Sequence, residues 1–185
     1  MQNGDREARF RAVYGASFQV VLAYCIRRTS TPQDAADAAA DTFLVAWRRL
    51  DDLPAGQAET PWLLATARRV LSNQRRGECR FVELRARLAT EIATHSLSIE
   101  VPGDVDDRAF ADAFAGLTPD ERDILGMSAW EELSSEQIGT VLGCSPGAAR
   151  TRLHRARHRL RRLIDETEAG FHETAASSHP KAQEE

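Results

Sequence analysis

The 185-residue sequence is poor in several residue types: it has one lysine against 23 arginines, 6% aromatic residues and three cysteines. The cysteines are odd in number and lie far apart along the chain, so a disulfide framework is not expected. No apolar run approaches the length of a membrane-spanning helix. No basic start followed by an apolar run marks a secretory signal. These absences predict a cytoplasmic protein.

Patterns typical of enzymes and metal sites are also lacking. The sequence has no glycine-rich phosphate loop, no HExxH pattern and no nucleophile elbow. His154 and His158 are spaced as i and i+4, but a single cysteine, Cys144, is near them, whereas a structural zinc site needs four ligands. We therefore expect no enzymatic activity, no metal and no cofactor.

Runs of alternating β-branched residues are missing, whereas alanine, leucine and arginine dominate. This mixture favours helices and predicts an all-α fold. The net charge of −4 is unevenly distributed, because residues 165–185 carry −5 and the other 164 residues sum to +1. Residues 145–163 hold seven arginines and no acid. A local basic helix in a mildly acidic protein indicates a selective DNA contact, with a merely solvated arginine-rich helix as the alternative.

The N-terminal half predicts three amphipathic helices. The first spans about residues 6–28, and the second begins at Thr31-Pro32, a capping residue followed by proline. A loop over residues 51–59 precedes the third helix, which is predicted to begin at Thr60-Pro61 and to end near Gly77. The inner face of the second helix is expected to carry Ala36, Ala40, Phe43, Trp47 and Leu50.

The C-terminal half predicts short helices joined by tight turns. Capping boxes are expected at Thr118–Glu121 and Ser134–Gln137, and Ser145-Pro146 begins the last helix. A short helix over residues 135–142 that ends at Gly143 and is followed by a longer helix has the pattern of a helix-turn-helix.

The last helix has two distinct faces. Its inner face is expected to carry Ala149, Leu153, Ala156, Leu160 and Leu163. Small residues lie at the start of its outer face, where a recognition helix must approach the floor of the major groove. The predicted DNA contacts there are Arg150, Thr151, Arg152, His154 and Arg155.

These motifs resemble the extracytoplasmic-function group of bacterial sigma factors. The stretch from Leu117-Thr118-Pro119-Asp120-Glu121-Arg122 to Arg157 is similar to that family's region four, which reads the −35 promoter element. Residues 34–50 resemble the part of region two that docks on the clamp helices of RNA polymerase, and Trp62 to Arg76 resembles the part that captures the melted −10 strand. Glu132 departs from the family pattern, which has a turn glycine at that position.

The resemblance implies an alternative sigma factor that binds core RNA polymerase and promoter DNA. Its partners would be the β′ clamp helices, the β flap and an anti-sigma factor. The implied −10 contacts are Arg68, Arg69, Asn73 and Arg76. The implied polymerase contacts are Asp34, Asp37, Asp41 and Arg48. The acids of the loop, Asp51, Asp52 and Glu59, either accept from base amines or are merely solvated.

The expected domain organisation follows the two motif clusters. Residues 1–80 would form region two, 81–105 a linker, 106–166 the helix-turn-helix of region four, and 167–185 a polar, disordered tail. Two other functions share part of this pattern. A helix-turn-helix regulator that is not a polymerase subunit would need only residues 117–163, and a helical adaptor would not need the seven arginines of the last helix.

Overall fold

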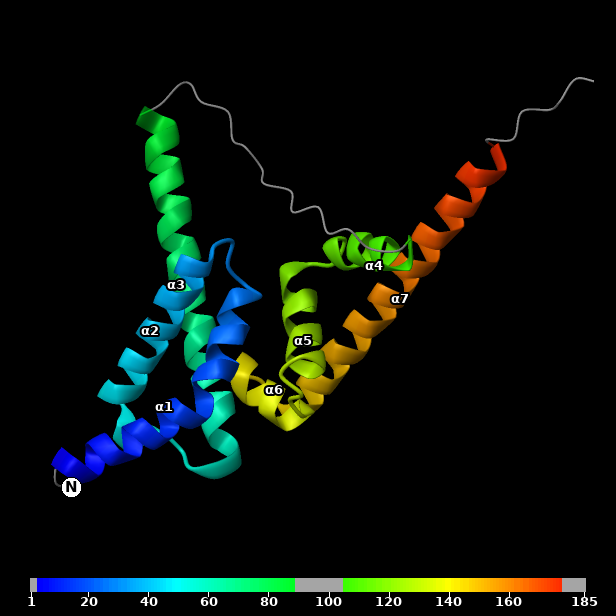
Figure 1. Cartoon of the computed structure of the whole chain (residues 1–185). Coiled ribbons are helices and arrows are strands. Elements are labelled where there is room, and N and C mark those ends of the chain that lie inside the picture. The colour runs from blue at the N-terminus through cyan, green and yellow to red at the C-terminus, as the bar shows by residue number, and fades with distance from the viewer. Residues whose placement is uncertain (1–2, 89–104, 178–185) are drawn as a thin grey trace, which may run out of the picture. The chain divides into compact units, whose positions relative to one another are not determined.

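The computed structural model describes the backbone of residues 3–88 and 105–177 and the side chains of residues 4–76 and 110–167. Within these ranges the chain forms seven α-helices and two short 3-10 turns and contains no strand, which confirms the predicted all-α fold (Figure 1). The elements are α1 (Asn3–Ile26), α2 (Pro32–Arg48), η1 (Leu50–Asp52), η2 (Gly56–Ala58), α3 (Glu59–Leu88), α4 (Val105–Ala115), α5 (Pro119–Ala129), α6 (Ser135–Leu142) and α7 (Pro146–Ser177).

The helices belong to two compact units, which are described separately. The first contains α1, α2 and α3, together with α6 and the start of α7 within Glu131–Ala149. The second contains α4, α5 and the part of α7 from Arg150 onward. The sequence predicts domains that fold independently of each other, and this stays a prediction. The predicted boundaries are 1–80, 81–105, 106–166 and 167–185. Residues 89–104 of the predicted linker lie outside the described residues.

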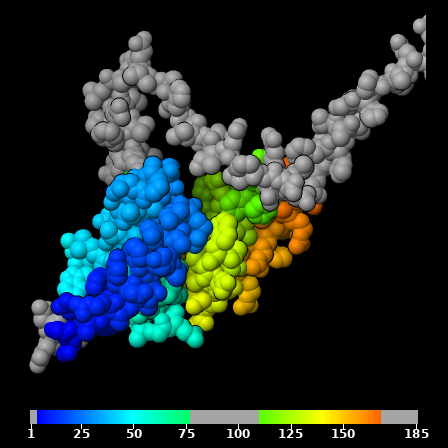
Figure 2. Space-filling model, in the orientation of Figure 1, coloured from blue at the N-terminus to red at the C-terminus, as the bar shows by residue number. Residues whose placement is uncertain are grey.

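The core of the first unit lies between α1, α2 and α3. The α1 residues Val21, Tyr24 and Cys25 are fully buried, as are Leu63 and Leu64 of α3. Full burial of a large aliphatic side chain stabilises a fold by about 1.5–3 kcal/mol. Helices α1 and α2 lie side by side, and Figure 2 shows their surfaces in continuous contact.

Helix α2 begins as the sequence predicts, but its inner face differs from the prediction. The Thr31 side chain accepts a hydrogen bond from the backbone N–H of Asp34. Ala36 and Ala40, which were expected inside, are exposed. Alanine occupies most positions of the first turns, so the pattern there has no period, and packing against α1 and α3 selects the buried set. The buried residues are Ala35, Ala38, Ala39, Thr42, Phe43 and Ala46.

Two helices are longer than predicted. Helix α3 continues through Gly77 to Leu88, because a glycine costs an α-helix only about 1 kcal/mol and removes no backbone donor. Helix α7 extends to Ser177, so the predicted disordered tail, 167–185, is helical over residues 167–177. Glutamate and alanine in this segment are good helix formers, and the helix already established before them needs no new nucleus.

The predicted local signals of the C-terminal half are confirmed. Thr118 and Glu121 form a reciprocal capping box at the start of α5, and Ser134 and Gln137 form another at the start of α6. Gly143 ends α6 in the left-handed conformation, with φ 67°. These contacts join residues three or four positions apart, which is why the sequence alone predicted them.

The turn between α6 and α7 is tight. A Cβ atom on Gly139 would lie 2.8 Å from the carbonyl oxygen of Cys144, so a side chain at this position of α6 would collide with backbone. The Ser145 hydroxyl accepts from the N–H of Ala148 and caps α7. Glu132 has a φ of 52°, a conformation that costs a non-glycine residue about 1–2 kcal/mol. The family that the sequence resembles has a glycine at this position.

Candidate nucleic-acid interface

The outer face of the first turns of α7 is exposed and basic. All five residues predicted to contact the −35 element are exposed there: Arg150, Thr151, Arg152, His154 and Arg155. The predicted inner face is confirmed, because Ala149, Leu153 and Ala156 are buried and Leu160 and Leu163 are half-buried. Burial of this apolar stripe fixes the rotation of α7 about its axis, and this rotation directs the basic face to solvent.

Later arginines of α7 are engaged by other side chains of the second unit. Arg157 donates to the Ser128 hydroxyl at 2.9 Å. Arg159 lies 3.6 Å from Glu121 of α5, and Arg162 pairs with Glu166 at 3.3 Å. Apart from the exposed Arg161, the arginines of α7 are therefore of two kinds. Those of the first turns lie on the open outer face, and these three later ones are held by neighbouring acids or a hydroxyl.

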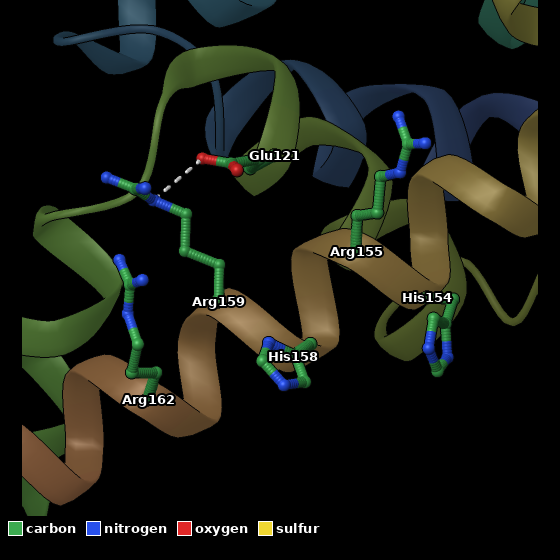
Figure 3. A pocket seen from close by; sticks show the side chains of 6 residues that line it. All are labelled: Glu121, His154, Arg155, His158, Arg159 and Arg162. Carbon is green, nitrogen blue, oxygen red and sulfur yellow. Dashed lines mark ion pairs between the residues drawn. The ribbon is translucent and has the colours of Figure 1, made fainter.

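A shallow cleft follows the same helix. It is lined by Glu121, His154, Arg155, His158, Arg159 and Arg162. Figure 3 shows that Arg159 reaches across the cleft to Glu121, while Arg155 and Arg162 lie to either side of it along α7. Five of the six lining side chains are basic types, so the cleft is suited to an anion such as a phosphate.

Glu121 connects the cleft to the capping box of α5. Burial opposes ionisation of this carboxyl, but hydrogen bonds from the backbone and hydroxyl of Thr118 and the nearby Arg159 guanidinium outweigh it, so the pKa of Glu121 is lowered. A lowered pKa in the folded state means that the ionised form stabilises the fold. This stabilisation is present above the ordinary pKa of about 4.5 and is lost as the pH falls through the folded-state pKa.

The variant Glu121→Gln tests this linkage. Glutamine keeps a side-chain oxygen for the capping box but loses the charge, so we expect the variant to be less stable at pH 7 by about 0.3–1 kcal/mol. The difference should disappear as the pH falls well below 4, because wild-type Glu121 is then protonated as well. Denaturant unfolding of both proteins across the pH range measures this. A difference that persists unchanged in acid would contradict the assignment.

The predicted −10 residues share one face of α3. Arg69, Asn73 and Arg76 are exposed at spacings of i, i+4 and i+7, and Arg68 is half-buried beside them. Arg76 donates to the side-chain oxygen of Asn73 at 3.0 Å and to the hydroxyl of Ser72 at 3.2 Å. The face is thus basic and ordered by its own contacts, as a track for a single strand requires.

The four predicted polymerase contacts lie along one stripe of α2. Asp37, Asp41 and Arg48 are exposed, and Asp34 is half-buried. Asp34 takes part in the cap of the helix, since its carboxylate accepts from the Thr31 hydroxyl at 2.6 Å. Asp37 accepts from the Gln33 amide at 3.0 Å. The stripe is acidic toward the start of α2 and basic at its end.

Contacts within the first unit also hold the loop between α2 and α3, and sequence reasoning missed the residues that make them. Asp51 pairs with Arg6, Asp52 pairs with Arg49, and Glu59 accepts from the buried hydroxyl of Ser17. Each of the three acids thus has a protein partner, and the side chains of Asp51 and Asp52 are also 66% and 61% exposed. The partners Arg6 and Ser17 lie more than 40 positions away in sequence, so no local pattern could have revealed them.

Two further observations concern metal binding and membrane-spanning helices. Among the residues that the structure describes, no three histidine, cysteine or acidic side chains gather as metal ligands would. In those same residues, no helix combines the length and apolarity needed to cross a membrane.

The fold and the exposed basic faces define a helical DNA-binding protein with a helix-turn-helix, and comparison with known proteins narrows this class. Residues 13–81 match the model for sigma-70 region 2, and residues 107–160 match the model for sigma-70 region 4. The ECF RNA polymerase sigma factor SigL of Mycobacterium tuberculosis is 30% identical over 86% of this chain and 90% of its own. The sigma factor CarQ of Myxococcus xanthus is 33% identical over 81% and 84%.

A solved structure agrees with these relatives. The sigma factor RpoE of Bartonella quintana, solved in complex with the anti-sigma factor NepR, superposes with a TM-score of 0.64 at 25% identity over 84% of this chain and 96% of that one. The chain therefore belongs to the extracytoplasmic-function sigma factors of the sigma-70 family. It is an alternative sigma factor that directs transcription initiation, and a regulator outside the polymerase is not favoured. Sigma factors are in general not enzymes.

Proposed function

We propose that this chain has three binding surfaces, one for core RNA polymerase and two for promoter DNA. The stripe of α2 with Asp34, Asp37, Asp41 and Arg48 binds the β′ clamp helices of core RNA polymerase. The face of α3 with Arg68, Arg69, Asn73 and Arg76 holds the melted −10 strand. The start of α7, with Arg150, Thr151, Arg152, His154 and Arg155, reads the −35 element. The exposure of all five α7 residues on one face, opposite a buried stripe, is the observation that carries this proposal.

The charges agree with these roles. The DNA-facing surfaces of α3 and α7 are arginine-rich, as phosphate contacts require. Arginine at the start of α7 can bind the O6 and N7 atoms of guanine, and the Thr151 methyl can contact a thymine methyl. Region four, residues 106–166, would bind DNA and the β flap, and region two, residues 1–80, would bind the clamp helices and the −10 strand.

The proposed partners and location follow from the family. The RpoE relative is bound to an anti-sigma factor, and this supports an anti-sigma partner for the present chain, which would hold it inactive until a signal arrives. The protein would work in the cytoplasm, where core polymerase is found, and would have no catalytic activity of its own.

Charge reversal on α2 tests the polymerase surface. We expect the double variant Asp37→Arg/Asp41→Arg to bind core polymerase at least about tenfold more weakly, because like charges at an interface cost several kcal/mol. Both positions are exposed, so the domain should still fold. Co-elution with core enzyme and a titration of binding measure the effect, and circular dichroism checks the helices.

A matched control changes the net charge equally at another place. Asp5→Arg/Glu7→Arg reverses two exposed acids at the start of α1, which lie outside the α2 stripe and outside region four. This control should bind core enzyme like the wild type. Wild-type affinity of the α2 variant, or equal weakening of both variants, would refute the proposed surface.

A further inference from the structure

The loop between α2 and α3 is held by the first helix of the protein. It runs from Leu50 to Glu59, the first residue of α3, and includes η1 and η2. Leu50 and Leu53 are buried and anchor its first half, whereas residues 55–58 are all exposed. This exposed crest carries one polar side chain, Gln57. Any contact between the loop and a ligand must therefore be made by a short segment whose position is set by the anchors before it.

Arg6 of α1 holds the point where α2 ends and the loop begins. Its guanidinium donates to the carbonyl oxygen of Trp47 at 2.7 Å and to the carboxylate of Asp51 at 2.8 Å, and it lies 5.3 Å from the centre of the Trp47 ring. The last carbonyls of a helix have no partner within the helix, so this contact satisfies one of them. Arg6 is only 25% exposed, whereas Asp51 is 66% exposed, so the contact with the Trp47 carbonyl is the more sheltered of the two.

Arg9, one turn further along α1, holds the middle of the loop. Its guanidinium donates to the carbonyl oxygen of Leu53 at 2.6 Å. Leu53 lies between the two 3-10 turns, where the carbonyl groups have no helical ladder to join. A charged donor on a backbone oxygen makes one of the stronger hydrogen bonds in proteins. Ser17 completes the set at the far end by donating to Glu59 at 3.2 Å.

We propose that Arg6 and Arg9 are positioning residues for −10 recognition: they fix the backbone of the loop Leu50–Glu59, and thereby help to set base preference, without touching DNA themselves. This inference rests on the proposed function of region two in holding the melted −10 strand. The acids of the loop point to the same conclusion. Asp51 and Glu59 bind side chains of α1, and Asp52 binds Arg49, so the acids add contacts to those of Arg6 and Arg9, and the exposed residues 55–58 are the part of the segment that is open to a ligand.

The test uses side chains of similar length. Arg9→Met keeps an unbranched apolar stem and removes the donors, and Arg9→Lys restores a single cationic donor. Arg11→Met is the control, because Arg11 is exposed and pairs with Glu7 on α1, away from the loop. Each full-length protein is assembled with core polymerase and assayed for transcription from a promoter library randomised at the −10 element.

We expect Arg9→Met to lower the preference for the favoured −10 sequences over the others by roughly three- to tenfold, which is the effect of one ordinary hydrogen bond on an equilibrium. Arg9→Lys should recover part of the preference, and Arg11→Met should match the wild type. Because preference is a ratio between templates transcribed by the same holoenzyme, the fraction of protein that is folded cancels. A merely stabilising role for Arg9 would lower total transcription and leave this ratio unchanged.

Two results would overturn the proposal in different ways. If the wild type has a −10 preference and Arg9→Met keeps it, or if Arg11→Met loses it equally, then the positioning role is wrong and the proposed function stands. If the wild type transcribes all −10 sequences alike, then the proposed role of region two fails, and the positioning role fails with it.

Discussion

Replacing Arg155 by alanine is expected to change which −35 sequences the holoenzyme prefers. Arg155 is exposed in the third turn of α7, close to the small residues that would let the helix approach the groove floor. Loss of a bidentate contact to a base should cost about 1–3 kcal/mol and relax preference at one base pair. Transcription by reconstituted holoenzyme on a library randomised at the −35 element measures this, without requiring tight DNA binding by the isolated protein.

Arg162 provides the matched control on the same helix. It lies two turns further on and pairs with Glu166 at 3.3 Å, at a distance along α7 where a straight helix leaves the groove. Arg162→Ala should weaken all promoters alike and reduce the salt dependence, because phosphate contacts carry no sequence information. Equal shifts of the preferred −35 sequence in both variants, or a shift in neither, would show that the proposed placement of α7 is wrong.

The second large effect is expected at Gly139, where the turn of the helix-turn-helix comes closest to α6. An alanine Cβ there would lie 2.8 Å from the Cys144 carbonyl oxygen and 3.4 Å from the Pro146 nitrogen. These are backbone atoms and cannot rotate away. Alanine favours helices over glycine by about 1 kcal/mol, but the overpacking should outweigh this gain, and we expect a net loss of about 1–3 kcal/mol.

Gly147→Ala is the control for this substitution. Gly147 lies in the first turn of α7, and a Cβ atom there would meet nothing within 4 Å. It should therefore raise stability by about 0.5–1 kcal/mol through its helix propensity. Thermal unfolding of both variants separates the two effects. A higher melting temperature for both would mean that the turn is looser than the distances indicate.

The sequence predicted best those features that depend on near neighbours. The caps at Thr31, Thr118 and Ser134 and the left-handed Gly143 were all predicted, because each joins groups three or four residues apart. The faces of α7 were also predicted, since leucine and arginine differ enough for the helical period to be visible. The inner face of α2 was not, because a run of alanines fits several rotations of a helix equally well.

Helix ends were less predictable than helix starts. Gly77 alone does not end α3, and the segment after Glu166 continues α7, because ending a helix requires a competing structure as well as a weak former. Glu132 adopts a φ of 52° although its residue type disfavours it. The surrounding turn imposes this conformation. Glutamate itself gives no hint of it, whereas the glycine that the family has at this position does.

The sequence by itself determined the helical class, the helix-turn-helix and the two basic surfaces, because helical periodicity, capping and local charge are properties of neighbouring residues. Only the tertiary structure decided what the acids of the α2–α3 loop do and which side chains hold that loop. Arg6, Arg9 and Ser17 contact it from 42 to 45 positions away. Such contacts depend on how α1 packs beside α2 and α3, and packing of distant segments leaves no periodic trace in the sequence.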